Sequence, residues 1–189
     1  MTIKKIIREC RKGNQRSWKM LIDTYSKKIF NLAYQFTGSY ETSEDLTQEI
    51  FIKVYNSLHK YDCSRNFNSW IATLSRNYLI DHYRKTKLEK KKRTDFNEHI
   101  LDSESKTDPE ENIIKKQNQK IIWEGIRSLN PDVRMAVILR DIQGKKYEDI
   151  AEIMSSPLGT VKSRVNRGRI KLAKILKKEK ENKNEMPAN

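Results

Sequence analysis

The densest group of side chains that could do chemistry lies near the C-terminus, on a segment whose residue spacing predicts a helix. Residues 161–178 include eight basic residues and no acidic residue. The apolar and small positions step by four, three and four residues, so at about 100° per residue they form one narrow stripe. That stripe consists of Val161, Val165, Gly168 and Leu172. It must face the core of a small domain.

The opposite side of this helix has the residue types that contact duplex DNA. Ser163, Asn166, Arg167 and Ile170 lie opposite the stripe, and basic residues stand along both edges. Hydrogen-bonding side chains can reach base edges in a major groove, while cations at the rims meet phosphates on both strands. The predicted duplex contacts are Lys162, Ser163, Arg164, Asn166, Arg167 and Arg169.

A basic amphipathic helix alone is a weak signal, because such helices also bind membrane surfaces or simply remain solvated. Here a short predicted helix, Tyr147–Met154, precedes it, and the turn Ser155-Ser156-Pro157 joins the two. We expect Ser156 to cap the second helix and Pro157 to open it. The order of short helix, tight turn and basic helix is typical of a helix-turn-helix.

Apolar spacing predicts a separate helical bundle upstream, of about 85 residues, which is enough for its own core. One helix should run through Trp18 and Phe36 and stop at Gly38. A second should begin near Thr42-Ser43, and a third should follow the polar loop 62–66. Trp70 and Tyr78 on the third helix are predicted to belong to the core.

Charge separates the two modules. Residues 84–93 include seven basic residues and one acid, whereas residues 94–111 include seven acids and one base. Such a segment, with few large apolar residues, is typical of an extended linker. We therefore predict an all-α protein of two small helical domains joined by a flexible linker. The predicted domains are 1–86 and 119–178, with the linker at 87–118 and a disordered tail at 179–189.

Composition narrows the class of function. The formal net charge of +14 could reflect general solubility, but its clustering favours a polyanionic partner. Two cysteines and three histidines show no metal-ligand spacing, so we expect no metal, no cofactor, no disulfide and a reducing, cytoplasmic location. No apolar run approaches a membrane span, and the N-terminus has no signal-peptide region. The carboxylates form no catalytic constellation, which disfavours an enzyme.

Two stretches resemble a known family. The stretch 128–176 resembles region 4 of the extracytoplasmic-function (ECF) sigma factors, a bacterial group of the sigma-70 family. Tyr147–Ile153 and Pro157–Val165 carry this match. Upstream, Glu44–Tyr55 resembles region 2.2 of the same family, and 67–71 and 76–81 resemble the promoter-melting regions. Together the two matches cover most of the chain in the family's order.

The resemblance implies a subunit that joins core RNA polymerase, directs it to promoters and helps to open the DNA. The C-terminal module would read the minus-35 element as duplex, and the N-terminal module would capture the melted minus-10 element. The implied minus-10 contacts are Arg65, Asn66, Arg76, Asn77, Asp81 and Arg84. Single-stranded bases can be read on exposed edges once they are unstacked. The polarity of Asn77 and Asp81 could also be a local property of their helix.

The family also implies protein partners. A docking surface for the polymerase clamp would consist of Asp45, Gln48, Glu49 and Ile52. The acidic residues there also suit a helix start, where the helix dipole favours negative charge, and both interpretations can hold together. The family further implies an anti-sigma factor as a partner.

Two other functions compete with this one. A stand-alone helix-turn-helix regulator would need the basic helix but has no reason to carry the Asp45–Tyr55 segment. An enzyme acting on nucleic acid would need the catalytic constellation that the sequence lacks. The chain also departs from the family pattern: the turn usually has glycine and then an apolar residue where Ser155 and Ser156 stand, and Ile170 occupies a usually polar position.

Overall fold

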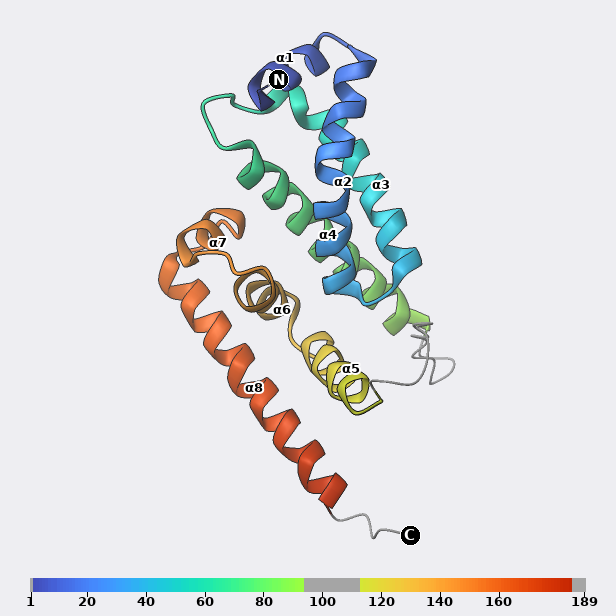
Figure 1. The fold of residues 1–189 in the computed structure, drawn as a ribbon, viewed down its shortest axis with the longest axis vertical. Helices are drawn as coiled ribbons and strands as arrows, with labels where there is room; N and C mark the ends of the chain where they lie inside the picture. Colours follow the sequence, from blue (N-terminus) through green and yellow to red (C-terminus); the bar gives the residue numbers. More distant parts are fainter. Residues whose placement is uncertain (1, 94–112, 185–189) are drawn as a thin grey trace. The chain divides into compact units, whose positions relative to one another are not determined.

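The computed structural model describes residues 2–93 and 113–184, and within these residues every regular element is a helix (Figure 1). The predicted all-α class is therefore confirmed. The chain divides into two compact units, one built on α1 to α4 and the other on α5, α6, η2 and α8, with α7 leading into α8. Each unit is described by itself.

The first unit is a bundle around the long helix α2. It consists of α1 (Ile3–Arg11), α2 (Gln15–Thr37), α3 (Tyr40–Ser57), the 3₁₀ turn η1 (Leu58–Lys60) and α4 (Phe67–Arg93). α2 packs against α1, α3 and α4, and α3 also packs against α4. The buried side chains recur at three- and four-residue steps, as in Leu21, Tyr25, Ile29 and Leu32 of α2.

Local chemistry sets the helix ends of this unit. The Asn14 side chain caps α2 by accepting from the Ser17 amide at 2.9 Å, and Gly38 ends the same helix with φ +80°, as predicted. The prediction that α3 begins near Thr42-Ser43 is two residues late, and neither of these residues is the cap. α3 begins at Tyr40, because Ser39 caps it and accepts from the Thr42 amide at 3.3 Å.

The second unit surrounds a buried segment that starts with α6. It consists of α5 (Ile113–Arg127), α6 (Pro131–Val137), the π-helical turn η2 (Ile138–Ile142), α7 (Tyr147–Ile153) and α8 (Leu158–Asn184). α8 packs against both α6 and α5. Asn130 caps α6 and Pro131 opens it, the order that the backbone preferences of Asn and Pro favour, and Gly144 follows η2 with φ +65°.

A buried arginine joins two elements of this unit. Arg134 is only 3% exposed, and its guanidinium donates to the carbonyl oxygens of Arg127 and Leu129 at the end of α5. A buried cation is tolerated only where acceptors replace the lost water, and carbonyls at a helix end, which carry partial negative charge, serve that purpose.

Two helices run further than the sequence prediction. α4 continues to Arg93, past the predicted domain end at residue 86, and α8 continues to Asn184, past residue 178. α5 begins at Ile113, inside the predicted linker. Lys, Glu, Leu and Arg are good helix formers, and Lys177 pairs with Glu181 one turn on at 3.7 Å. The rest of the predicted linker, 94–112, and of the predicted tail, 185–189, lies outside the described residues.

Across the described ranges, no helix is both long and apolar enough to cross a bilayer.

Candidate nucleic-acid interface

Three of the four residues that the spacing assigned to the core side of α8 are buried, and the fourth, Leu172, is half-buried. Val161 and Val165 are fully inaccessible, and Gly168 is buried against α6. A methyl group on Gly168 would collide with a Cγ of Val137 and would lie 3.1 Å from a Cγ of Val133. The absence of a side chain at residue 168 therefore lets α8 lie close to α6 and fixes which side of α8 faces outward.

The outward side of α8 is the predicted base-facing strip. Ser163, Asn166 and Arg167 are exposed, and so are Lys162 at one edge and Ile170 further along. The Arg167 Nε makes a long contact, 3.4 Å, with the Ser163 carbonyl of its own helix. Its guanidinium is thus held along α8 and retains donors for an external acceptor.

Cations beside this strip are held by residues of the same unit. Arg164 is half-buried and donates to the Ser156 hydroxyl at 2.9 Å, in the turn before α8. Lys171 donates to the Ser128 carbonyl at 3.0 Å. These bonds place the two cations at defined positions along the rim of the strip, a feature that helical spacing could not predict.

Arg169 forms the strongest of these pairs. Its Nε and Nη2 donate to the two carboxylate oxygens of Asp141 at 3.1 and 2.5 Å. This paired hydrogen bonding raises the pKa of Arg169 above its already high ordinary value. Two of the five guanidinium N–H groups are used, and the side chain remains 53% exposed, so the others stay accessible to solvent.

The turn between α7 and α8 departs from ordinary backbone geometry at one residue. Ser155 has φ +46°, which is the left-handed region that favours glycine. The Ser156 amide closes the end of α7 by donating to the Ala151 carbonyl at 3.0 Å. α8 begins at Leu158, one residue after the predicted Pro157. The Tyr147 ring that opens α7 has the Arg140 guanidinium 4.6 Å from its centre and Lys162 at 6.0 Å.

In the first unit, α4 presents several of the predicted single-strand contacts on its surface. Asn77, Asp81 and Arg84 are exposed, and Arg84 lies 3.9 Å from Asp81, one turn earlier. Arg76 is half-buried and donates from Nη1 to the Asn77 side-chain oxygen at 2.7 Å. The four residues thus form two contacting polar pairs on α4.

Arg65 and Asn66 come from the loop before α4, and their side chains behave differently. Arg65 is largely exposed, with its side chain 76% accessible and 3.9 Å from the Asp62 carboxylate. Asn66 caps α4, because its side-chain oxygen accepts from the amides of Asn68 at 2.8 Å and Ser69 at 3.4 Å. The side-chain NH₂ group of Asn66 takes part in neither of these two bonds.

Aromatic rings fill the space behind this loop. Phe67 and Tyr61 are buried and contact each other, and Trp70 packs against both at ring-centre distances of 5.4 and 5.1 Å. Trp70 is half-buried, so its prediction as a core residue is only partly correct. Tyr78 is also half-buried, and its hydroxyl donates to the Glu49 carboxylate on α3. Sequence reasoning did not predict that bond.

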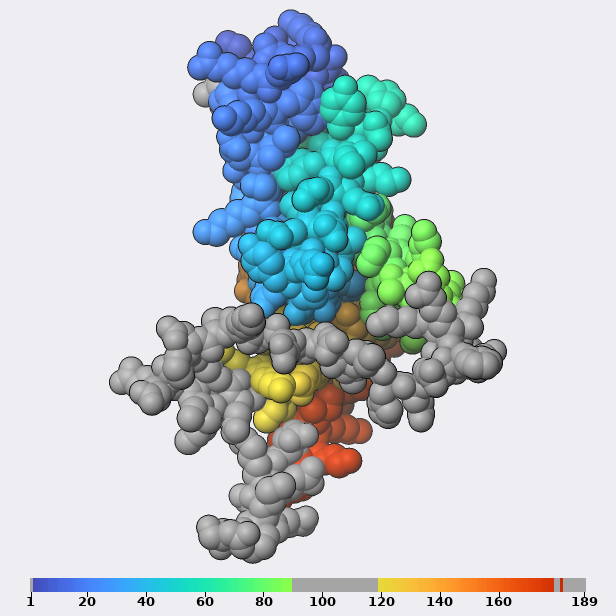
Figure 2. All heavy atoms as spheres, turned by 90° about the vertical axis from the view of Figure 1, so that its right-hand side faces the viewer, coloured from blue at the N-terminus to red at the C-terminus, as the bar shows by residue number. Residues whose placement is uncertain are grey.

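The four predicted polymerase contacts lie along one exposed side of α3. Asp45, Gln48, Glu49 and Ile52 are exposed, whereas Leu46, Ile50 and Val54 on the other side are buried. Figure 2 shows α3, in light blue to cyan, uncovered on one face of the unit between blue α2 and the green end of α4. Ile52 is an apolar side chain 59% exposed in this acidic strip.

Among the described residues, no cluster of three His, Cys, Asp or Glu is placed to hold a metal ion.

Comparison with known proteins gives matches to both units. The family described as Sigma-70 region 2 matches residues 21–89, and that described as Sigma-70, region 4 matches residues 119–172. The chain is similar to the ECF RNA polymerase sigma factor SigW of Bacillus subtilis, with 31% identity over 94% of this chain and 98% of that protein. It is also similar to the ECF RNA polymerase sigma-E factor of Escherichia coli K12, with 30% identity over 89% and 91% of the two chains.

Solved structures share the fold. The sigma factor RpoE, crystallised with the anti-sigma factor NepR from Bartonella quintana, matches with a TM-score of 0.66 and 24% identity, over 86% of this chain and 98% of that one. CnrH, in complex with the cytosolic domain of CnrY, has the same TM-score at 19% identity, over 92% and 96% of the two chains.

Proposed function

The chain belongs to the ECF sigma factors of the sigma-70 family, which direct promoter-specific initiation of transcription, and on that premise we propose how its two units divide promoter recognition. The second unit reads the minus-35 element as duplex, and the first captures the melted minus-10 strand and binds core RNA polymerase. The observation that carries the proposal is the outward strip of α8, with hydrogen-bonding residues along its middle and cations on its rims.

The minus-35 contacts divide by chemistry. Lys162, Ser163, Asn166 and Arg167 lie where side chains of a helix in the major groove meet base edges. Arg164, Arg169 and Lys171 contact phosphates, and their intramolecular bonds hold them in place for that purpose. Arg169 is the weakest phosphate candidate of the three because Asp141 already offsets its charge.

The minus-10 contacts are proposed on the surface that joins the 61–66 loop to α4. Arg65, with its exposed guanidinium, and Arg76 and Arg84 on α4 supply positive charge that can bind a DNA backbone. Asn77 and Asp81 offer hydrogen-bonding groups for the edges of unstacked bases. Asn66 contributes through its NH₂ group, since its oxygen caps the helix.

The exposed strip of α3 is the proposed site for core polymerase. Asp45, Glu49 and Gln48 suit a basic partner surface, and Ile52 offers an apolar contact at the end of the strip. We assign the domain roles to 1–86 and 119–178. We propose further that the protein works in the cytoplasm without catalysing a reaction of its own. An anti-sigma factor is proposed as a second partner because RpoE and CnrH, which share the fold, were solved in complexes.

Run-off transcription with purified core polymerase tests this function. The protein is added to core on sheared genomic template, and the transcripts are mapped to find a promoter. The expected result is initiation from discrete sites that depends on the protein and is lost when the upstream or downstream promoter element is scrambled.

The alternative, a stand-alone helix-turn-helix regulator, gives a different result. It would bind duplex DNA without core and yield no promoter-specific transcript with core on any template. A useful matched pair of variants is Asp45→Lys, in the proposed polymerase strip, and Glu148→Lys, an exposed residue of α7 in the other unit. Only Asp45→Lys should weaken the binding of core.

A further inference from the structure

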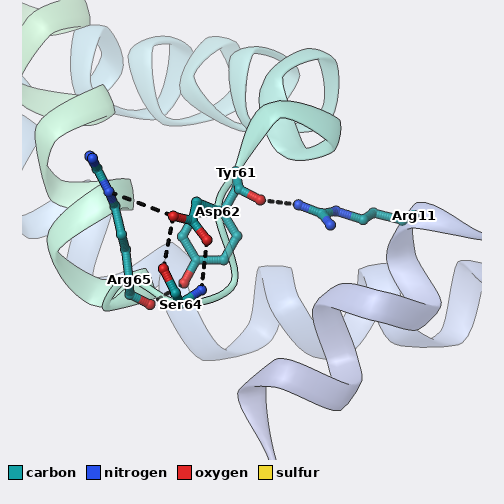
Figure 3. A network of polar contacts seen from close by, with 5 residues as sticks. All are labelled: Arg11, Tyr61, Asp62, Ser64 and Arg65. Atoms are coloured by element: carbon teal, nitrogen blue, oxygen red, sulfur yellow. Dashed lines mark hydrogen bonds and ion pairs between the residues drawn. The ribbon is translucent and has the colours of Figure 1, made fainter.

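The loop between η1 and α4 is anchored by a helix that lies far from it in the sequence. Arg11 ends α1, and its Nε donates to the Leu58 carbonyl at 3.0 Å. Its Nη2 donates to the Tyr61 carbonyl, as Figure 3 shows. A guanidinium presents two N–H groups in a rigid fork, so one side chain can fix the end of η1 and the start of the loop together.

The interior of the loop is also closed by hydrogen bonds. The Tyr61 ring is buried, and its hydroxyl donates to the Arg65 carbonyl at 2.6 Å, so the first and fifth residues of the loop are tied together. Asp62 accepts from the amide and the hydroxyl of Ser64 at 2.9 and 2.8 Å, as Figure 3 shows. These bonds lower the pKa of the Asp62 carboxyl below its ordinary value.

The result is a loop with a fixed backbone and exposed side chains. Arg65 projects from it into solvent, and Asn66 begins α4 as its cap. α1 lies before residue 21, where the match to Sigma-70 region 2 begins, so the anchor comes from a part of the chain outside that match. A loop that is already ordered loses less conformational entropy when it binds a ligand.

We propose that Arg11 and the Tyr61 hydroxyl are positioning residues that hold loop 61–66 in the shape in which Arg65 and Asn66 meet the single-stranded minus-10 element. This inference rests on the proposed function of the first unit. Neither residue is assigned a contact with DNA: Arg11 acts through the backbone of Tyr61, and the Tyr61 hydroxyl acts through the backbone of Arg65.

The first test needs no DNA. Cys63 lies inside the loop and is partly exposed, whereas Cys10 is buried, so Cys63 is the faster-reacting thiol. Its alkylation rate in the free, full-length protein reports loop mobility. Arg11→Gln and Tyr61→Phe should each raise that rate about threefold or more, because opening of the loop becomes easier. Arg8→Gln, at an exposed position one turn earlier on α1, should leave it unchanged.

The second test uses holoenzyme reconstituted with the full chain. The probe is a single-stranded oligonucleotide with the non-template minus-10 sequence of a promoter mapped by run-off transcription. Arg11→Gln should weaken its binding about fivefold to tenfold, which corresponds to roughly 1–1.4 kcal/mol. Arg11→Lys, which has a charge but no fork, should fall between wild type and Arg11→Gln. Affinity for core and for minus-35 duplex should not change.

Three outcomes would overturn the proposal: equal effects of Arg11→Gln and Arg8→Gln, an unchanged Cys63 rate, or equal loss of core, minus-35 and minus-10 binding by Arg11→Gln. The last would mean that Arg11 serves only the stability of the unit. Failure of the proposed function looks different, because wild-type holoenzyme itself would then not discriminate the minus-10 oligonucleotide from a scrambled one, while the Cys63 rates would still respond.

Discussion

At the scale of single residues, Arg167 and Lys174 of α8 separate base reading from simple charge. Both are exposed on the same side of α8 and each carries one positive charge, but Arg167 lies beside Ser163 and Asn166, whereas Lys174 lies two turns further towards the C-terminal end of the helix. Arg167→Ala should lower the preference of holoenzyme for the promoter over random duplex by about 1–3 kcal/mol. Lys174→Ala should weaken both DNAs alike. Competition binding between promoter and random duplex measures the difference.

Salt dependence provides the control for this pair. Any variant that removes a phosphate contact reduces the slope of log affinity against log salt by about 0.9, whichever DNA is used. If both variants lost affinity equally for promoter and random duplex, the assignment of α8 to the groove would be wrong.

Cys10 gives a pH dependence whose sign follows from its burial. Burial raises the pKa of its thiol from 9.0 to about 11, so the folded state retains a proton that the unfolded chain loses first. The contribution of Cys10 to stability is complete below pH 9 and falls as pH rises towards 11, by up to about 1.4 kcal/mol per pH unit. Urea unfolding at pH 8 and pH 10 should show a smaller difference between wild type and Cys10→Ala at pH 10; equal differences would contradict the argument.

Residue spacing predicted one class of feature and missed another. It predicted the buried stripe and the exposed strip of α8, because helical geometry alone determines which side a residue faces. It missed the bonds from Arg169 to Asp141, Tyr78 to Glu49 and Arg11 to Leu58, which join residues 28, 29 and 47 positions apart. Such contacts depend on how helices pack, and a local pattern contains no information on that. The proposed DNA and polymerase contacts themselves remain predictions.

At the scale of elements, the contact of α8 with α6 depends on Gly168. Gly168→Ala should destabilise the second unit by about 1–2 kcal/mol, since the collision with Val137 and Val133 outweighs the gain in helix propensity. Gly159→Ala is the matched control on the same helix, because a methyl group there meets nothing within 4 Å and should stabilise by up to about 1 kcal/mol. Chemical denaturation followed by circular dichroism measures both; destabilisation of equal size would contradict the packing argument.

In the turn between α7 and α8, a substitution to glycine should stabilise the protein, whereas on α8 the loss of Gly168 should destabilise it. Ser155 has φ +46°, which costs a residue with a side chain about 1–2 kcal/mol, whereas glycine loses only about 0.5–1 kcal/mol more backbone entropy on folding. Ser155→Gly should therefore raise the melting temperature by a few degrees. Ser156→Gly should lower it, because the Ser156 hydroxyl accepts from Arg164. A fall for Ser155→Gly would mean that its side chain contributes more than the strain costs.

The existence of the helices was easier to predict than their ends. Gly38 and Asn130-Pro131 set their boundaries through their own backbone preferences, and the structure agrees. α3 begins earlier than predicted because two serines, Ser39 and Ser43, compete as caps, and only the backbone path decides between them. α4 and α8 run on because strongly charged sequences rich in Lys and Glu are also good helix formers.

At the scale of the whole molecule, the chain consists of two units that each bury an apolar core. Ile50, Leu21 and Phe36 are fully buried in the first, and Met135, Ile138 and Val165 in the second. The reversal of charge in the sequence predicted this division without any structure. The division into two units suits the proposed reading of two promoter elements. Joining two weak binding modules makes the second contact intramolecular and raises the overall affinity.

This organisation predicts that the two units fold independently. Fragments covering residues 2–93 and 113–184 should each be helical and unfold cooperatively, because each contains its own core. Gly168→Ala should lower the stability of the 113–184 fragment as much as it lowers the corresponding transition of the full chain, and should leave the other transition unchanged. Circular dichroism and calorimetry measure both effects. If the full chain instead showed a single transition that Gly168→Ala shifted as a whole, the two units would stabilise each other. Binding of one unit to its promoter element would then also stabilise the other unit.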